Sequence, residues 1–238
     1  MNFKKTFVVI PTLNEKKNIG QLVQQIFSLY PDLNILIVDD NSTDGSLVLI
    51  KQLQRKCANL HLLVRTKNKG RGAACVAGFQ YILSNFAQTK YVIEMDADFS
   101  HDPKEIPKLL AAGAPQTVVV GSRYVRGSKI VAWPLWRIVL SKLANFYARL
   151  VLQIPIHDYT DGFRCYSTSD LKKLDLSQIK HPGFITLSEI AYLLQKRGVK
   201  FREIPITFTD RTQGKSHATL KELLSSLKAI IEIRLNEI

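Results

Sequence analysis

Apolar and polar positions follow two periods in the first half of the chain. Short apolar runs, most of them rich in β-branched residues, recur at Thr6–Ile10, Asn34–Val38, Leu60–Arg65, Tyr91–Met95 and Thr117–Val120. Between them, apolar residues recur at helical spacing near Glu15–Ser28, Ser46–Arg55, Gly72–Asn85 and Lys104–Ala112. Strands that alternate with helices predict βαβ units, and therefore an α/β fold with a mostly parallel, Rossmann-like sheet flanked by helices.

The second half has a different pattern. Leu135–Leu152 predicts a mainly apolar helix, followed by a loop at His157–Tyr166 and a helix near Leu187–Arg197. Glu203–Thr209 is typical of a strand that leads into a polar turn. A C-terminal amphipathic helix closes the chain, and its apolar stripe comprises Leu220, Leu223, Leu224, Leu227, Ile230, Ile231 and Leu235. No linker-like boundary interrupts residues 1–238, so we expect a single domain.

Polar turns follow four of the predicted strands, at PTLNE, DDNSTDG, KNKGRG and DADFSHD. Ligands of an open α/β sheet bind outside the carboxyl ends of its strands, so these turns should meet in one crevice. Asp96 and Asp98 are two residues apart after the apolar run YVIEM. Two such carboxylates can share one hard divalent cation, Mg²⁺ or Mn²⁺, which would neutralise a diphosphate. A solvated acidic turn is the alternative.

Asp39 and Asp40 close the earlier apolar run NILIV. An acidic pair at this edge of a sheet can accept hydrogen bonds from a nucleotide base or from ribose hydroxyls. The alternative is helix capping, because Ser42, Thr43 and Asp44 are all competent N-cap residues.

Charge adds a second line of evidence. The chain carries 33 Lys and Arg against 20 Asp and Glu, a formal net charge of +13. A protein this basic usually meets phosphate in a nucleic acid, a nucleotide or an anionic membrane. The segment from Ile106 to His157 contains no acidic residue. It contains seven basic ones: Lys108, Arg123, Arg126, Lys129, Arg137, Lys142 and Arg149. A solvated basic face without a ligand is the alternative.

Other features limit the cellular setting. The three cysteines lack CxxC spacing, which favours neither a disulfide framework nor a zinc site. The first residues contain no apolar signal-peptide core. The longest charge-free run, Gly72–Thr89, is interrupted by polar residues and is typical of a core helix. We therefore expect a cytoplasmic protein without a transmembrane segment.

Eight motifs occur in an order that resembles one known family. They are VVIPTLNE, IVDDNSTDG, NKGRGAA, MDADFSHDP, GSRY, WPLWRIVLS, DGFRCY and EIPITFTDRTQGKS. In this order they resemble the polyprenyl-phosphate (dolichol-phosphate) mannosyltransferases, which are inverting family 2 glycosyltransferases with a GT-A fold. The resemblance extends from Val8 to about Lys221. The first four motifs are common to family 2, and the last four are more specific to enzymes with lipid-phosphate acceptors.

The resemblance implies transfer of a hexose, mannose from GDP-mannose, onto a polyprenyl or dolichyl phosphate. The implied donor pocket comprises Pro11, Glu15, Val38, Asp40, Asp96, Ala97 and Asp98. The implied metal ligands are Asp96, Asp98 and Ser100. The implied contacts with the acceptor phosphate are Arg123, Arg137, Ser141, Arg211 and His217. Asp98, Arg123 and Arg211 would carry catalysis.

Three positions depart from the family pattern. His217 replaces a common Lys, so a phosphate contact there would depend on pH. Asp161 stands in TDGF where relatives have TSGF, close to a loop that is expected to be functional. Leu13 replaces a frequent Tyr and removes a ring that could stack on the nucleotide base.

The helix at Leu135–Leu152 combines a narrow polar stripe with an apolar surface. Arg137 and Ser141 are four residues apart and therefore share one face, while most other positions are apolar. Such a helix can lie in a membrane interface with its stripe toward the active site, and Trp133 and Trp136 suit the headgroup level. We expect segments 130–155 and 218–238 to be membrane-interface helices on the cytoplasmic face of an anionic membrane. A separate membrane-anchoring subunit is compatible with this picture, and an ordinary core helix with a snorkelling Arg is the alternative.

A lipid phosphate is already ionised at pH 7, so the transfer needs no strong general base. Positioning by arginines and charge neutralisation by a metal ion are sufficient. The alternatives are a family 2 enzyme with another donor, such as UDP-glucose, or with a non-lipid acceptor. A basic nucleic-acid-binding protein is a further alternative, but no such motif occurs and the arginines alternate with apolar positions. A dehydrogenase is disfavoured because Gly70-Arg71-Gly72 does not continue as GxGxxG.

Overall fold

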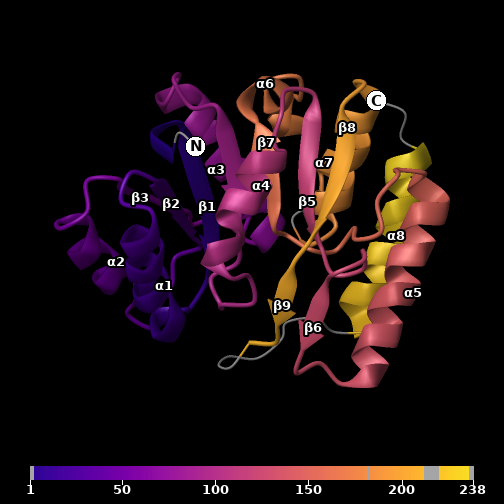
Figure 1. Cartoon of the computed structure of the whole chain (residues 1–238), viewed down its shortest axis with the longest axis horizontal. Coiled ribbons are helices and arrows are strands. Elements are labelled where there is room, and N and C mark those ends of the chain that lie inside the picture. The colour runs from indigo at the N-terminus through magenta and orange to yellow at the C-terminus, as the bar shows by residue number, and fades with distance from the viewer. Residues whose placement is uncertain (1–2, 182, 212–219, 236–238) are drawn as a thin grey trace.

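The computed structural model describes residues 3–181, 183–211 and 220–235. A seven-stranded sheet lies at its centre, in the order β3-β2-β1-β4-β7-β5-β8 (Figure 1). These strands are β1 (Thr6–Thr12), β2 (Asn34–Asp39), β3 (Leu60–Val64), β4 (Tyr91–Glu94), β5 (Thr117–Ser122), β7 (Arg164–Ser167) and β8 (Lys200–Pro205). All neighbouring pairs are parallel except those of β7, which runs antiparallel to β4 and β5.

Helices connect the strands as the sequence predicts. The longer ones are α1 (Lys16–Leu29), α2 (Ser46–Gln54), α3 (Arg71–Asn85), α4 (Ile106–Ala112), α5 (Leu135–Leu152), α7 (Thr186–Lys196) and α8 (Leu220–Leu235). The short ones are η1 (Phe3–Lys5), η2 (Pro103–Glu105), α6 (Thr168–Leu171) and η3 (Leu176–Gln178). The five strands predicted in the first half and the helix at Leu135–Leu152 are confirmed, with ends that differ by at most two residues.

Alternate strand residues fill two cores, one on each face of the sheet. On β1, Val8 and Ile10 pack with α1, α2 and α4, whereas Phe7 and Val9 pack with α3, α5, α7 and α8. Successive side chains of a strand point to opposite faces, so helices on both sides are required to bury continuous apolar runs such as NILIV. The predicted Rossmann-like α/β architecture is therefore confirmed.

Two predicted elements are wrong in detail. The predicted loop His157–Tyr166 ends in a strand, β7, which pairs with β4 and β5. The predicted strand Glu203–Thr209 is two strands, β8 and β9 (Thr207–Thr209), because the chain changes sheets at Ile206. The Ile206 N–H donates to Ser122, while its carbonyl accepts from Lys129 at the start of β6 (Lys129–Val131). β6 and β9 form a small parallel sheet beyond the carboxyl ends of β5 and β8 (Figure 1).

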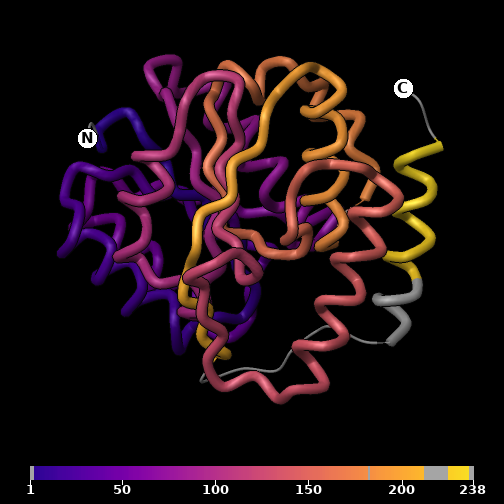
Figure 2. The backbone as a smooth tube through the Cα atoms, turned by 45° about the vertical axis from the view of Figure 1, so that its right-hand side comes forward, coloured from indigo at the N-terminus to yellow at the C-terminus, as the bar shows by residue number. Residues whose placement is uncertain are grey.

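α5 and α8 lie side by side at one edge of the molecule (Figures 1 and 2). The apolar stripe of α8 is only partly buried among the described side chains. Ile230 is buried, but Ile231 and Leu235 are 45% and 73% exposed, and the helix buries Ala229 and Ile233 instead. α8 therefore packs through a neighbouring face. Among the described residues, no helix is both long and apolar enough to span a bilayer.

Candidate active site

The carboxyl end of β2 carries two buried aspartates with different partners. Asp39 accepts the N–H and the hydroxyl of Ser42, both at 2.7 Å, and so stabilises the following turn. Asp40 accepts from Arg65 Nη1 at 2.8 Å and from the Gly70 N–H at 2.7 Å. Asp40 thereby holds the loop between β3 and α3 beside the end of β2.

The carboxyl end of β4 carries the Asp96–Asp98 pair. Asp96 Oδ1 accepts from Nε and Nη2 of Arg71, at 2.9 and 2.7 Å. Asp98 Oδ1 accepts the Ser100 N–H at 3.1 Å, and its Oδ2 lies 3.4 Å from Arg211 Nη2. The two carboxylates are 24% and 8% exposed. They are therefore held by arginines rather than forming a solvated acidic turn.

β9 brings Arg211 to this pair from far along the chain. The Thr209 N–H donates to the Ser100 carbonyl at 3.3 Å, and Phe208 forms a β-bridge with His101. Arg211, two residues after β9, therefore reaches Asp98. Glu15, at the start of α1, belongs to the same group of charges. Burial raises the pKa of Glu15 and the charge of Asp98 adds to this, while Arg211 acts in the opposite direction.

Three of the predicted donor residues do not present side chains to this edge. Pro11 and Val38 are adjacent in register across β1 and β2, and both are buried. The Val38 side chain faces Gly78 of α3 in one core, and Ala97 is part of the other. These residues can contribute only main-chain atoms and shape to a donor pocket.

Arg123, directly after β5, is almost fully buried. Its Nε and Nη2 donate to the two oxygens of Asp158, both at 2.7 Å, and Nη2 also donates to Thr160 at 2.6 Å. Asp161 Oδ2 lies 3.3 Å from Nε. Burial opposes the charge of Arg123, but these carboxylates raise its pKa.

Arg137 and Ser141 face inward from α5, as their spacing predicts. Arg137 Nη1 contacts both oxygens of Asp210, at 3.0 and 3.1 Å, and its guanidinium carbon lies 4.2 Å from the Trp133 ring centroid. Ser141 accepts from the hydroxyl of Tyr124 at 2.6 Å.

These contacts join the predicted acceptor residues into one cluster. The Arg123 guanidinium carbon also lies 5.2 Å from the Trp133 ring, so Arg123 and Arg137 share that ring. Asp210, the partner of Arg137, immediately precedes Arg211. The structure thus links Arg123, Arg137, Ser141 and Arg211 through a chain of contacts that reaches Asp98 at Arg211, whereas His217 lies outside the described residues.

Asp161, the departure in TDGF, is a buried counter-charge. Its Oδ1 accepts the Phe163 N–H at 2.8 Å and lies 3.1 Å from His101 Nε2. Burial alone would raise the pKa of Asp161, but His101 and Arg123 hold it below its usual range. His101 Nδ1 in turn accepts the N–H of Asp96 at 3.1 Å. Through His101, Asp161 therefore links the loop before β7 to the Asp96–Asp98 turn.

The sequence reasoning missed the partners of the site residues. Arg65, Arg71, Asp158 and Asp210 each form an ion pair with a predicted site residue. Arg71 lies in the motif NKGRGAA and Asp210 lies beside Arg211 in EIPITFTDRTQGKS, so these motifs indicated where the two residues occur but not what they contact. Their pairing depends on tertiary contacts, which neither periodicity nor spacing encodes.

A metal ion at Asp96 and Asp98 would need ligands from a substrate. No group of three or more His, Cys, Asp and Glu side chains among the described residues is arranged to hold an ion. Mg²⁺ and Mn²⁺ bind through one or two carboxylates together with phosphate and water oxygens. The donor set of two carboxylates at this edge fits such an ion when a diphosphate is present.

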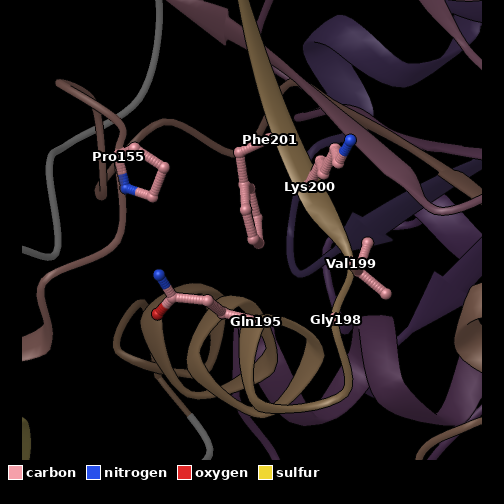
Figure 3. Close-up of a pocket in the computed structure, with 6 residues that line it drawn as sticks. All are labelled: Pro155, Gln195, Gly198, Val199, Lys200 and Phe201. Atoms are coloured by element: carbon pink, nitrogen blue, oxygen red, sulfur yellow. The ribbon is translucent and has the colours of Figure 1, made fainter.

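A cavity of about 420 Å³ lies elsewhere (Figure 3). It is lined by Pro155, Gln195, Gly198, Val199, Lys200 and Phe201. Lys200 begins β8, which is parallel to β5, so this cavity lies at the amino ends of those strands. It contains no carboxylate and is separate from the cluster at the carboxyl ends.

The sequence of this chain is similar over most of its length to those of three mannose-transferring proteins. A polyprenol monophosphomannose synthase of Mycolicibacterium smegmatis is 37% identical over 96% of this chain and 86% of its own length. An undecaprenyl-phosphate mannosyltransferase of Micrococcus luteus is 33% identical, over 89% of this chain and 86% of its own. A dolichol-phosphate mannosyltransferase of Pyrococcus furiosus is also 33% identical, over 96% of this chain, which covers 63% of that protein.

Solved structures support the fold alone. The glucosyl-3-phosphoglycerate synthase of Mycobacterium tuberculosis, in complex with Mn²⁺, UDP and glucosyl-3-phosphoglycerate, has a TM-score of 0.64 at 17% identity. The match covers 96% of this chain and 78% of that one.

The mostly parallel sheet flanked by helices is a GT-A-like fold, and the similar sequences show that the chain is a glycosyltransferase. The chain belongs to glycosyl transferase family 2, whose sequence profile matches residues 7–175. It is therefore neither a non-enzymatic nucleic-acid-binding protein nor a nicotinamide dehydrogenase.

The buried pair of Arg123 and Asp158 predicts a large loss of stability in Asp158→Ala. Removing Asp158 leaves the buried Arg123 guanidinium with the longer contact to Asp161 as its remaining ion pair, so the free energy of unfolding should fall by about 3 kcal/mol, the lower end of the cost of breaking a buried pair. Urea denaturation measures this. In the control Asp32→Ala, which removes a 63% exposed carboxylate beside Lys4, the loss should stay below about 1 kcal/mol. Equal losses in the two variants would contradict the structural role of Asp158.

Proposed function

We propose that this chain transfers mannose from GDP-mannose to a polyprenyl or dolichyl phosphate, with inversion at the anomeric carbon. Relatives named as a polyprenol monophosphomannose synthase and as mannosyltransferases of undecaprenyl phosphate and dolichol phosphate match 89–96% of the chain at 33–37% identity. The observation that carries the proposal is the contact between Asp98 and Arg211. It joins the strand-end carboxylates to a cluster of arginines within one site, as transfer from a nucleotide–sugar to a phosphate requires.

The donor would lie across the ends of β1, β2 and β4. Glu15 and Asp40 offer carboxylates there, and Pro11, Val38 and Ala97 offer main-chain atoms. Asp96, Asp98 and Ser100 would hold a Mg²⁺ or Mn²⁺ ion, which neutralises the charge of the donor diphosphate when bound. The glucosyl-3-phosphoglycerate synthase, which shares the fold, was solved with both Mn²⁺ and UDP.

The acceptor phosphate would lie between Arg137, Ser141, Arg211 and His217. Arg123 donates through Nε and Nη2 to Asp158 and Thr160 and so holds the loop that carries them, which leaves Nη1 as the nitrogen that would serve the phosphate. An ionised phosphate oxygen attacks the anomeric carbon in line. The bond from that carbon to the diphosphate breaks, and its electron pair leaves with GDP. No proton moves, so the work of the protein is positioning and electrostatic stabilisation.

α5 supports peripheral contact with a membrane. Its outward face carries large apolar side chains, at 40–80% exposure: Leu135, Trp136, Val139, Leu140, Leu143, Phe146 and Leu150. This exposure disfavours the alternative of an ordinary core helix. The basic residues Lys142 and Arg149 are exposed on the same helix and suit an anionic surface. We propose that residues 1–238 form one GT-A domain that binds the cytoplasmic face of a membrane through segments 130–155 and 218–238.

Partners follow from this assignment. A lipid acceptor must stay partly in the bilayer, so the active site has to be held at the membrane surface. Peripheral binding through α5 and α8 meets this need, and a separate membrane-anchoring subunit would strengthen it. We expect no nucleic-acid partner.

A panel of nucleotide–sugars tests the proposed reaction. The protein is incubated with each labelled donor, a polyprenyl phosphate and Mg²⁺ or Mn²⁺, and the lipid is extracted into organic solvent. Label from GDP-mannose should enter the lipid, Asp98→Ala should abolish this transfer, and Arg211→Ala should reduce acceptor use at least tenfold.

Three outcomes would each overturn part of the proposal. Label from UDP-glucose but not GDP-mannose would reassign the donor. Release of free sugar, or transfer to a water-soluble acceptor, with none in the lipid would reject the lipid phosphate. A near-normal rate in Asp98→Ala would reject the metal assignment.

Vesicle binding tests the membrane face. Leu143→Glu and Phe146→Glu each remove a large, exposed apolar side chain, worth about 1.5–3 kcal/mol when buried. Co-sedimentation with anionic vesicles should weaken at least tenfold in each variant. Val48→Glu is the matched control, because Val48 is 61% exposed on α2, outside the proposed face. Equal weakening in the control, or none in Leu143→Glu, would place membrane contact elsewhere.

A further inference from the structure

Arg71, the first residue of α3, reaches across to the end of β4. Its guanidinium contacts Asp96 through two nitrogens and forms a further short contact with Glu94, which is 1% exposed. The Arg71 side chain is itself only 12% exposed. Two nitrogens on one carboxylate oxygen and a third nitrogen on a second acid fix the plane of the guanidinium, and with it the orientation of Asp96.

Glycine at position 162 leaves the space that this guanidinium occupies. A Cβ atom added to Gly162 would lie 1.8 Å from Nη2 of Arg71 and 2.7 Å from its guanidinium carbon. No side chain fits there while Arg71 contacts Asp96. On another side, the ring of Phe184 lies 5.5 Å from the same guanidinium carbon.

The backbone of Arg71 is held equally closely. A Cβ on the next residue, Gly72, would lie 2.3 Å from the carbonyl oxygen of Gly183 and 1.9 Å from Oγ1 of Thr186. The first turn of α3 is therefore packed directly on the segment that begins α7. Because backbone and guanidinium are both fixed, Arg71 has little freedom to leave Asp96.

We propose that Arg71 is a positioning residue, which orients Asp96 and couples it to the loop that carries Gly162. This rests on the proposed function, in which Asp96 holds the metal ion and the donor. The same loop supplies Asp158 and Asp161 to Arg123. One loop thus contacts an arginine on the donor side, through Gly162, and an arginine on the acceptor side, through its aspartates.

A double-mutant cycle tests the contact itself without any ligand. Gly162→Ala should lower the thermal denaturation midpoint when Arg71 is present, because the new methyl group and the guanidinium compete for one space. In an Arg71→Gln background the shorter side chain leaves that space, so Gly162→Ala should have a clearly smaller effect. Gly183→Ala is the matched control, because its Cβ would meet nothing within 4 Å.

A second readout tests the consequence for Asp96. GDP binding is measured by calorimetry with and without Mn²⁺, and the ratio of the two affinities is compared between variants. Arg71→Gln and Gly162→Ala should each reduce this ratio about tenfold, because the affinity for GDP with Mn²⁺ should fall more than the affinity without it. Arg71→Lys keeps the positive charge but lacks the two guanidinium nitrogens that contact Asp96, so its affinity ratio should be intermediate. Gly183→Ala should have the same ratio as the unaltered protein.

The outcomes separate the two proposals. Additive effects of Arg71→Gln and Gly162→Ala on the denaturation midpoint would overturn the contact, whatever the protein binds. An unchanged Mn²⁺ ratio in Arg71→Gln would overturn the positioning role. Failure of the unaltered protein to bind GDP more tightly with Mn²⁺ would instead reject the donor assignment, and a role for Arg71 in orienting a metal ligand would fall with it.

Discussion

Ion pairs at the carboxyl ends of the strands, each between an arginine and an aspartate from different parts of the chain, determine how this site is built. A charge taken out of water must be paired and hydrogen-bonded, because an unpaired one costs several kcal/mol. Asp40 has Arg65, Asp96 has Arg71, Asp98 has Arg211, and Arg123 has Asp158. Each pair ties a loop to the carboxyl edge of the sheet. The positions of these loops therefore depend on the same ion pairs that hold the site residues.

The same pairing explains how a chain with a net charge of +13 can be arranged around an acidic turn. Arginines balance the aspartates, and the remaining positive charge is available for ligands that bring their own negative charge. A nucleoside diphosphate and a lipid phosphate are ligands of this kind. Arg137 and Arg211 are both about one quarter exposed, so they are fixed by Asp210 and Asp98 and still accessible.

Much of the fold could be predicted from the sequence, because strong periodicity marks long elements. Leu135–Leu152 was predicted to the residue, and the strands of the first half follow their apolar runs. β7 was missed because four residues at the end of a loop carry no period, and only pairing with β4 and β5 makes them a strand. For the site, the turns and acids follow from strand ends, whereas Arg71 and Asp158 depend on which loops pack together.

Binding of Mn²⁺ to the unaltered protein, measured by calorimetry alone and with saturating GDP, tests the arginine-paired site most directly. Two carboxylates already engaged by arginines should bind the ion weakly until the diphosphate supplies further oxygens and competes for Arg211. After correction for Mn²⁺ binding to GDP itself, the affinity should rise at least tenfold with GDP. The same Mn²⁺ affinity in both titrations would contradict the proposed site.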